Sequence, residues 1–222
     1  HGAPTDVNAH PHVSANGKFA IIHNGIVENF AMLREELTAK GYEFKSETDT
    51  EVIAHLLECY YTGDFKQAVM KATARLEGAY ALGVICSDFP GVLYAVKEAS
   101  PLIIGLGAGE NFFASDVTAL VNHTKNVMYL EDGEFAELTK DKVTVFDGAG
   151  REVNKEISRV TWDISVAEKG GYDHFMLKEI MEQPRALKAT IEPRIKDSKI
   201  VLDNFDLSPE ELKDINKIII TA

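Results

Sequence analysis

The feature that most constrains the fold is a change in the spacing of the apolar residues near Ala79. Before it, apolar residues recur at helical spacing in three segments, at 26–37, 52–60 and 65–76. After it come short apolar runs separated by turn residues, which predict strands at 80–85, 92–96, 102–104, 112–114, 127–130, 135–138 and 143–146. Helices followed by a meander of strands predict an α+β fold, with a mostly antiparallel sheet covered by helices.

Local signals refine this prediction at several points of the chain. The apolar run 19–22 predicts a buried strand, and we expect His23-Asn24-Gly25 to form the turn that ends it. A hydroxyl at Thr48 followed by an acid at Glu51 predicts a capped helix start, and Asp64 with Gln67 predicts another. Residues 176–191 predict a helix that Pro184 interrupts.

Composition excludes several classes of protein. The 222 residues include 45% hydrophobic residues, enough for one large domain or two small ones, and too many for general disorder. No apolar stretch approaches the ~20 residues of a membrane span. The net charge of −12 argues against nucleic acid as a main partner. Two cysteines, Cys59 and Cys86, are too few for a disulfide framework and predict a reducing compartment.

Two places in the sequence suggest chemistry. The Asn24 amide and the Gly25 N–H are able to converge on one carbonyl oxygen as an oxyanion hole, although a plain tight turn also explains the pair. Asp49, at a predicted helix start, suits the ammonium group of an amino acid, although an ordinary first-turn acid is the alternative.

Other candidate sites fail on their chemistry. His10 and His12, with His1 or His23, lack the carboxylate or thiolate partners of a zinc site, so we expect no metal. The glycines at 105, 107 and 109 do not match a phosphate-binding loop, because Glu110 stands in the last glycine position. The two cysteines lie among apolar neighbours and are expected to behave as small hydrophobes. The residues by themselves therefore point to no nucleophile.

A set of motifs resembles the glutaminase domain of the glutamine–fructose-6-phosphate aminotransferase family. They cover almost the whole chain in the family's order: His1-Gly2, Asn8-Ala9-His10-Pro11-His12, His23-Asn24-Gly25-Ile26-Val27-Glu28-Asn29, Ser46-Glu47-Thr48-Asp49-Thr50-Glu51, Ser100-Pro101-Leu102, Ala114-Ser115-Asp116, Tyr129-Leu130-Glu131-Asp132-Gly133-Glu134, His174-Phe175-Met176 and Lys178-Glu179-Ile180-Met181-Glu182-Gln183-Pro184. The resemblance implies an N-terminal-nucleophile hydrolase fold, an αββα sandwich that here lacks its first strands and helices.

The resemblance also implies a division of the chain. Residues 1–165 resemble a partial glutaminase domain, residues 166–212 the connector between domains, and residues 213–222 the start of the first sugar-isomerase domain. The implied activity is hydrolysis of glutamine, whose ammonia converts fructose 6-phosphate to glucosamine 6-phosphate without a cofactor. The implied partners are glutamine and the enzyme's own isomerase domain, in a cytoplasmic protein that is a homodimer at full length.

The implied site residues follow from the motifs. Asn24 and Gly25 would form the oxyanion hole, Asp49 with Gly25 would hold the α-ammonium group of glutamine, and His1 would lie beside its α-carboxylate. The family's nucleophile is a cysteine at the mature N-terminus, which neither Cys59 nor Cys86 matches. We therefore expect sequence to be missing upstream of His1 and the isolated chain to be inactive.

Two alternatives stay open. One is the glutaminase domain of another class II amidotransferase, such as amidophosphoribosyltransferase. The other is a non-catalytic module that binds glutamine. The resemblance of 178–184 to the connector, and of the last residues to an isomerase strand, favours the aminotransferase.

Overall fold

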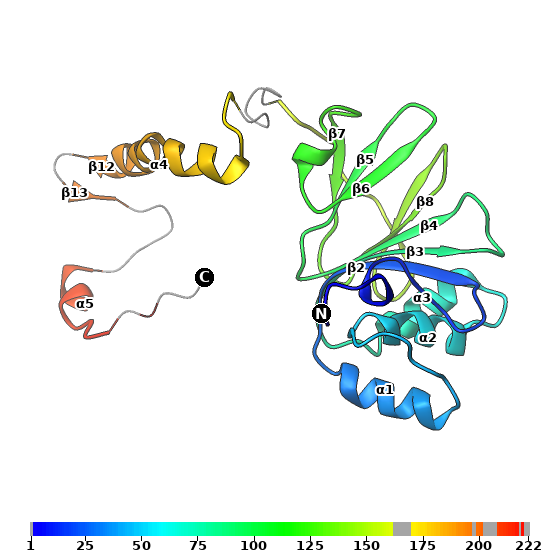
Figure 1. Ribbon diagram of the computed structural model, residues 1–222. Helices are drawn as coiled ribbons and strands as arrows, with labels where there is room; N and C mark the ends of the chain where they lie inside the picture. Colours follow the sequence, from blue (N-terminus) through cyan, green and yellow to red (C-terminus); the bar gives the residue numbers. More distant parts are fainter. Residues whose placement is uncertain (1, 162–169, 197–198, 202–207, 218, 220–222) are drawn as a thin grey trace. The chain divides into compact units, whose positions relative to one another are not determined.

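The computed structural model describes residues 2–161, 170–196, 199–201, 208–217 and 219 (Figure 1). By its internal contacts the chain divides into two units, His1–Ile164 and Ser165–Ala222. His1, which the sequence analysis placed near a substrate carboxylate, lies outside the described residues. No helix among the described residues is long and apolar enough to cross a membrane.

A seven-stranded antiparallel sheet forms the centre of the first unit. Its longest pairing joins β2 to β3 over nine residues each, from Phe19 opposite Cys86 to Val27 opposite Gly78. Neighbouring strands elsewhere in the sheet are also antiparallel, as the meander of short runs predicts. In spatial order the strands are β1 (His12–Val13), β2 (Phe19–Val27), β3 (Gly78–Cys86), β4 (Leu93–Glu98), β8 (Phe135–Leu138), β9 (Val143–Phe146) and β10 (Glu152–Val153).

Three helices cover one face of this sheet: α1 (Phe30–Ala39), α2 (Glu51–Tyr60) and α3 (Phe65–Thr73) (Figure 1). Their apolar stripes pack against every second residue of the strands, because side chains alternate between the two faces of a strand. The Asp64 side chain accepts a hydrogen bond from Gln67 N at 3.0 Å, so the predicted cap of α3 is confirmed. The main core of this layer contains Phe19, Ile21, Val27, Leu33, Leu37, Val52, Ile53, Leu56, Leu57, Phe65, Val69, Leu82, Val84, Tyr94, Val96 and Phe135.

A four-stranded antiparallel sheet packs on the opposite face. Its order is β11 (Ser158–Arg159), β7 (Asn126–Tyr129), β5 (Ile103–Leu106) and β6 (Asn111–Ala114). Ile104 and Leu130 from this side meet Ala95 and Ala136 of the large sheet in a second core. A third cluster joins Ile103 to Leu120 and Val121, beyond the short helix η2 (Val117–Ala119). The helices and two stacked sheets make an α+β sandwich, as predicted.

One predicted turn is wrong. His23-Asn24-Gly25 does not end the strand but lies inside β2, which continues to Val27. The strand continues because β3 supplies a partner for each residue, with Asn24 opposite Ala81 and Gly25 opposite Tyr80. As a result the following helix begins at Phe30, and Ile26 belongs to the sheet rather than to the helix.

The predicted cap at the start of α2 is also wrong. Thr50, not Thr48, occupies the cap position, and its side chain makes no capping hydrogen bond. Glu51 instead turns back and accepts hydrogen bonds from Lys45 N at 2.9 Å and from Ser46 N and Oγ at 2.7 and 2.6 Å. Arg34 donates to Ser46 O at 3.0 Å. These contacts hold the loop that leads to Asp49 in one conformation.

The second unit contains α4 (Phe175–Ile191), η4 (Glu192–Arg194), the strands β12 (Ile195–Lys196) and β13 (Lys199–Ile200), and α5 (Pro209–Lys213). Helix α4 passes through Pro184 without ending there, contrary to the predicted interruption. Residues 218 and 220–222 of the predicted isomerase strand lie outside the described residues. The assignment of 1–165, 166–212 and 213–222 to three domains therefore stays a prediction.

Two adjacent isoleucines of β2 test which face of the strand is covered. Ile21 is fully buried against the helices, whereas Ile22 is 43% exposed. We expect Ile21→Ala to lower the free energy of unfolding by about 2–5 kcal/mol, and Ile22→Ala by about 1 kcal/mol or less. Urea unfolding monitored by circular dichroism measures both, and equal losses would contradict the assignment of faces.

The buried carboxylate of Glu51 gives a prediction for acid stability. Burial by itself raises the pKa of Glu51, but the hydrogen bonds from Lys45 and Ser46 outweigh it and hold the pKa below its usual 4.5. A carboxylate with a lowered pKa stabilises the fold above pH 4.5, and this contribution disappears as the pH falls through its folded-state pKa. At pH 7 we expect Glu51→Gln to cost about 1.5–3 kcal/mol, because an amide offers only one acceptor oxygen to these donors.

The measurement is urea unfolding of wild type and Glu51→Gln at pH 7 and at pH 3.5, with the exposed Glu35→Gln as control. Burial lowers the pKa of His12, His23 and His55, so both proteins also lose stability below pH 6.5. Only wild type also loses the contribution of the Glu51 charge, so the difference in unfolding free energy between the two proteins should shrink in acid. A difference that stays constant between the two pH values would show that the Glu51 charge carries no stability.

Candidate active site

The His23-Asn24-Gly25 segment presents its side chains to both faces of β2. His23 is buried on the face that the helices cover. Asn24 is exposed on the opposite face, which also carries Ile22 and Ile26. The small sheet leaves this part of the large sheet uncovered, since Ile26 is 57% exposed. The Asn24 amide is thus accessible to a ligand, as an oxyanion-binding group must be.

Gly25 occupies a position that only glycine fits. Its φ is +130°, a conformation that side chains rarely adopt, and a Cβ there would lie 2.0 Å from the carbonyl oxygen of Ala79. A similar contact recurs at Gly78 in the partner strand, where a Cβ would lie 2.3 Å from Ile26 O. The glycine in this motif therefore serves close packing of the two strands as well as any ligand.

Asp49 lies against the end of β2, immediately before α2. The residue is 7% exposed, and its Oδ2 accepts a hydrogen bond from Val27 N at 2.8 Å. Val27 follows Gly25 by two residues, so a contact between residues 22 positions apart brings the two predicted site residues together. Asp49 does not cap the helix and precedes its first turn, where Thr50 holds the cap position and Glu51 is the acidic residue.

A small cavity of about 210 Å³ opens beside Asp49. Its walls combine apolar side chains with carboxylates, and they are formed by Ile26, Val27, Glu28, Phe30, Glu47 and Asp49. Carboxylates in the wall of a partly apolar cavity favour a cationic group, because they attract positive charge. None of the three has an ion pair with a Lys, Arg or His of the described part of the chain. An ammonium group fits this description, and an anion does not.

The first residues of the chain lie next to the same cavity. Asn8 Oδ1 accepts a hydrogen bond from Glu47 N at 3.0 Å, and Asn8 Nδ2 donates to Ala3 O at 2.9 Å. A Cβ on Gly2 would lie 3.3 Å from Glu47 Cβ. The segment 2–8 is therefore held beside the loop that carries Asp49.

Two polar residues next to Asp49, His23 and Thr50, have no role in the site that the sequence predicts. His23 Nδ1 lies 2.9 Å from Thr50 Oγ1, and Thr50 Oγ1 lies 3.5 Å from Asp49 Oδ1. Burial lowers the pKa of His23 more than the nearby Asp49 carboxylate raises it, so its imidazole is neutral. The signal for Thr50 in the sequence is the run of hydroxyl and acidic residues from Ser46 to Glu51, but no periodicity predicts that this run is buried.

The sequence predicts no zinc site at His10, His12 and His23, and the structure gives the surroundings of His12. His12 Nε2 lies 3.3 Å from Thr48 Oγ1, and burial lowers the pKa of its imidazole. Within the described ranges no group of three His, Cys, Asp or Glu side chains is placed to hold a metal ion.

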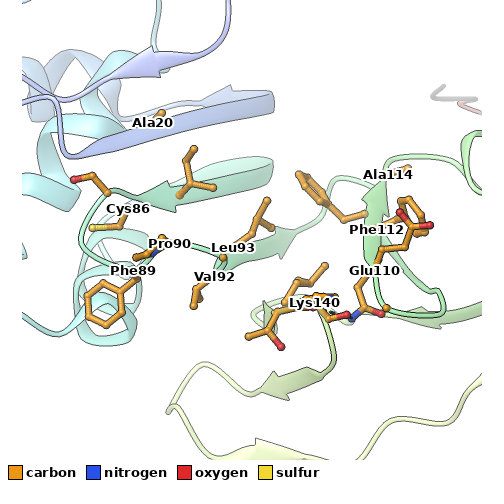
Figure 2. Close-up of a pocket in the computed structure, with 18 of the residues that line it drawn as sticks. Ala20, Cys86, Phe89, Pro90, Val92, Leu93, Glu110, Phe112, Ala114 and Lys140 are labelled. Atoms are coloured by element: carbon orange, nitrogen blue, oxygen red, sulfur yellow. Dashed lines mark hydrogen bonds between the residues drawn. The ribbon is translucent and has the colours of Figure 1, made fainter.

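A larger cavity of the first unit lies elsewhere. It has a volume of about 900 Å³ and is lined by residues of both sheets, among them Leu93 of the large sheet and Phe112 and Ala114 of the small one (Figure 2). Asn24, Gly25 and Asp49 do not line it. Its walls are mainly apolar, and Cys86 is nearly buried there in β3. This cavity is not part of the candidate site.

Comparison with known proteins identifies the family of the chain. The sequence pattern of the family described as "Glutamine amidotransferase domain" matches residues 4–122, more than half of the chain. A relative from Clostridium tetani, named glutamine–fructose-6-phosphate aminotransferase (isomerizing), is 53% identical over the whole chain. A relative of the same name from Aquifex aeolicus is 50% identical, again over the whole chain. The chain spans only 37% and 36% of these two proteins.

Solved structures give the same fold. Glutamine phosphoribosylpyrophosphate amidotransferase from B. subtilis, in complex with ADP and GMP, matches 66% of this chain and 33% of its own, with a TM-score of 0.57 and 26% identity. The structure titled as the allosteric regulatory enzyme of purine biosynthesis matches 64% of this chain and 31% of its own, with a TM-score of 0.53 and 27% identity. With the family pattern over residues 4–122, these findings show that the chain belongs to the glutamine amidotransferase domain family and has its class II, N-terminal-nucleophile hydrolase fold.

Proposed function

We propose that this chain is the glutamine-binding part of a longer aminotransferase, which releases ammonia from glutamine and uses it to convert fructose 6-phosphate to glucosamine 6-phosphate. The observation that carries the proposal is the Asp49 carboxylate, fixed by Val27 N beside the Asn24-Gly25 segment in a cavity suited to an ammonium group. Whole-chain identities of about 50% to named aminotransferases support this substrate over those of the purine enzymes, which are 26–27% identical.

Each site residue has a proposed role. Asp49, with Gly25, binds the α-ammonium group of glutamine through charge-assisted hydrogen bonds. The Asn24 side chain and the Gly25 N–H stabilise the oxyanion that forms when the side-chain amide is attacked. His1 is proposed to contact the α-carboxylate of glutamine, a role that its place in the sequence motif supports.

Neither cysteine of these 222 residues is proposed as the nucleophile. Cys86 lies opposite Phe19 in the β2–β3 ladder, about 17 Å along the strands from Asn24 at the usual rise per residue. Cys59 lies in α2 on the helical side of the sheet, with Lys40 Nζ 3.9 Å from its Sγ. A polypeptide limited to these residues is therefore proposed to have no glutaminase turnover.

The remaining partners belong to the longer protein. We propose that its sugar-isomerase part receives the ammonia, and that it dimerises through segments outside these residues. Both cysteines are free thiols, which fits a protein that works in the reducing cytoplasm.

The ammonium-binding role of Asp49 is tested by glutamine binding. We expect Asp49→Asn to weaken the affinity for L-glutamine at least about tenfold, because the amide removes the negative charge that faces the ammonium group. Titration monitored by NMR measures the affinity, with the exposed Asp141→Asn as control. Equal affinities of wild type and Asp49→Asn would contradict the proposal, and so would a wild-type protein that does not bind glutamine.

The absence of a nucleophile gives a separate prediction. Incubation of the 222-residue protein with glutamine should release no glutamate, and a diazoketone analogue of glutamine should leave its intact mass unchanged. The physical reason is that a thioester intermediate needs a thiolate within bonding distance of the substrate amide. Saturable labelling of Cys59 or Cys86 that glutamine prevents would overturn this prediction, whereas slow labelling that glutamine does not prevent would leave it intact.

A further inference from the structure

A chain of contacts runs from β2 through the start of α2 and returns to β2. It begins at His23 Nδ1, passes Thr50 Oγ1 at 2.9 Å and Asp49 Oδ1 at 3.5 Å, and returns from Asp49 Oδ2 to Val27 N at 2.8 Å. His23, Thr50 and Asp49 are each less than 10% exposed. Each oxygen of the Asp49 carboxylate thereby has a partner within the protein.

The direction of the hydrogen bonds follows from which atoms are left without a partner. His23 Nε2 is buried and makes no hydrogen bond within the described residues. In the first arrangement, Thr50 donates to His23 Nδ1, and the proton of the neutral imidazole is on Nε2 as a buried N–H without a partner. The Thr50 hydroxyl then has no proton left to donate to Asp49 Oδ1. In the second arrangement, His23 Nδ1–H donates to Thr50 Oγ1, and the Thr50 hydroxyl donates to Asp49 Oδ1. Only the lone pair of His23 Nε2 is then without a partner. Buried N–H groups without a partner are rarer than buried acceptors without one, so the second arrangement is favoured.

We propose that His23 and Thr50 are positioning residues for Asp49: a relay from His23 Nδ1–H through the Thr50 hydroxyl fixes the carboxylate in the orientation that receives the substrate's ammonium group. The second torsion of an aspartate side chain is broad, so a carboxylate held only at Oδ2 by Val27 N would rotate. The Thr50 hydroxyl removes this freedom by holding Oδ1. This inference rests on the proposed function, because it concerns the same ammonium site.

The relay also links the two halves of the site. His23 directly precedes Asn24 in β2, so the strand that carries the proposed oxyanion-binding residue is tied to the loop that carries Asp49, the proposed ammonium-binding residue. A ligand that lacks the ammonium group does not use Asp49 and should be insensitive to the relay. This difference separates a positioning role from a general contribution to stability.

The test compares two ligands and three variants. The ligands are L-glutamine and 4-carboxybutanamide, which is glutamine without its α-amino group. Thr50→Val removes the hydroxyl at nearly constant volume, Thr50→Ser keeps it, and Thr144→Val is a control at another buried threonine, in β9. We expect Thr50→Val to weaken glutamine binding about tenfold, the effect of one hydrogen bond to a charged group, and to leave the binding of 4-carboxybutanamide unchanged.

Thr50→Ser should retain glutamine affinity within about twofold, and Thr144→Val should bind both ligands as wild type does. Equal losses for the two ligands in a Thr50→Val protein that still folds would overturn the inference, because a general distortion affects both. If wild type binds no glutamine, the proposed function fails and the positioning role fails with it.

A second measurement tests the relay without any ligand. In protein labelled with ¹⁵N-histidine, the chemical shifts and proton couplings of His23 should show a neutral ring protonated at Nδ1, the less common tautomer. In Thr50→Val this preference should be lost, while Thr50→Ser should keep it. A His23 ring protonated at Nε2 in the wild-type protein would overturn the relay, whatever the result for glutamine binding.

Discussion

The antiparallel pairing of β2 with β3 supports every other part of the first unit. Nine residues of each strand are paired, and the helices, the small sheet and the Asp49 loop all pack against this ladder. The ladder closes tightly at its end, where Gly25 and Gly78 let the two backbones approach more closely than any side chain permits. The proposed site lies at this end, so the close approach of the β2 and β3 backbones is next to the cavity beside Asp49.

A cluster of buried polar residues lies where the charged site meets this ladder. Asp49, Glu51, His23 and His12 are all nearly buried, and each needs hydrogen bonds to offset the loss of water. Glu51 obtains them from the loop backbone at Lys45 and Ser46, which fixes the path of the chain toward Asp49. Clusters of this kind are typical of functional sites, because apolar residues would stabilise the fold better but bind no charged ligand.

Several elements were predictable because their causes are local. The apolar runs from 80–85 to 143–146 are strands in the structure, and the Asp64 cap of α3 depends only on residues within one helical turn. The same local reasoning failed at His23-Asn24-Gly25, where a partner strand about 55 residues later converts a predicted turn into paired backbone. It also failed at Thr48 and Glu51, because the loop backbone competes with the helix for the Glu51 carboxylate.

The sequence by itself determined the α+β class, the family and the identity of the proposed site residues, since residue types and their order carry that information. Only the tertiary structure decided that Asn24 and His23 point to opposite faces of β2. It also decided that Asp49 is held by Val27, and that Thr50 stands between Asp49 and His23. The physical reason is that these contacts join β2 to a loop more than 20 residues away, and such contacts form only when the sheet and its helices pack together.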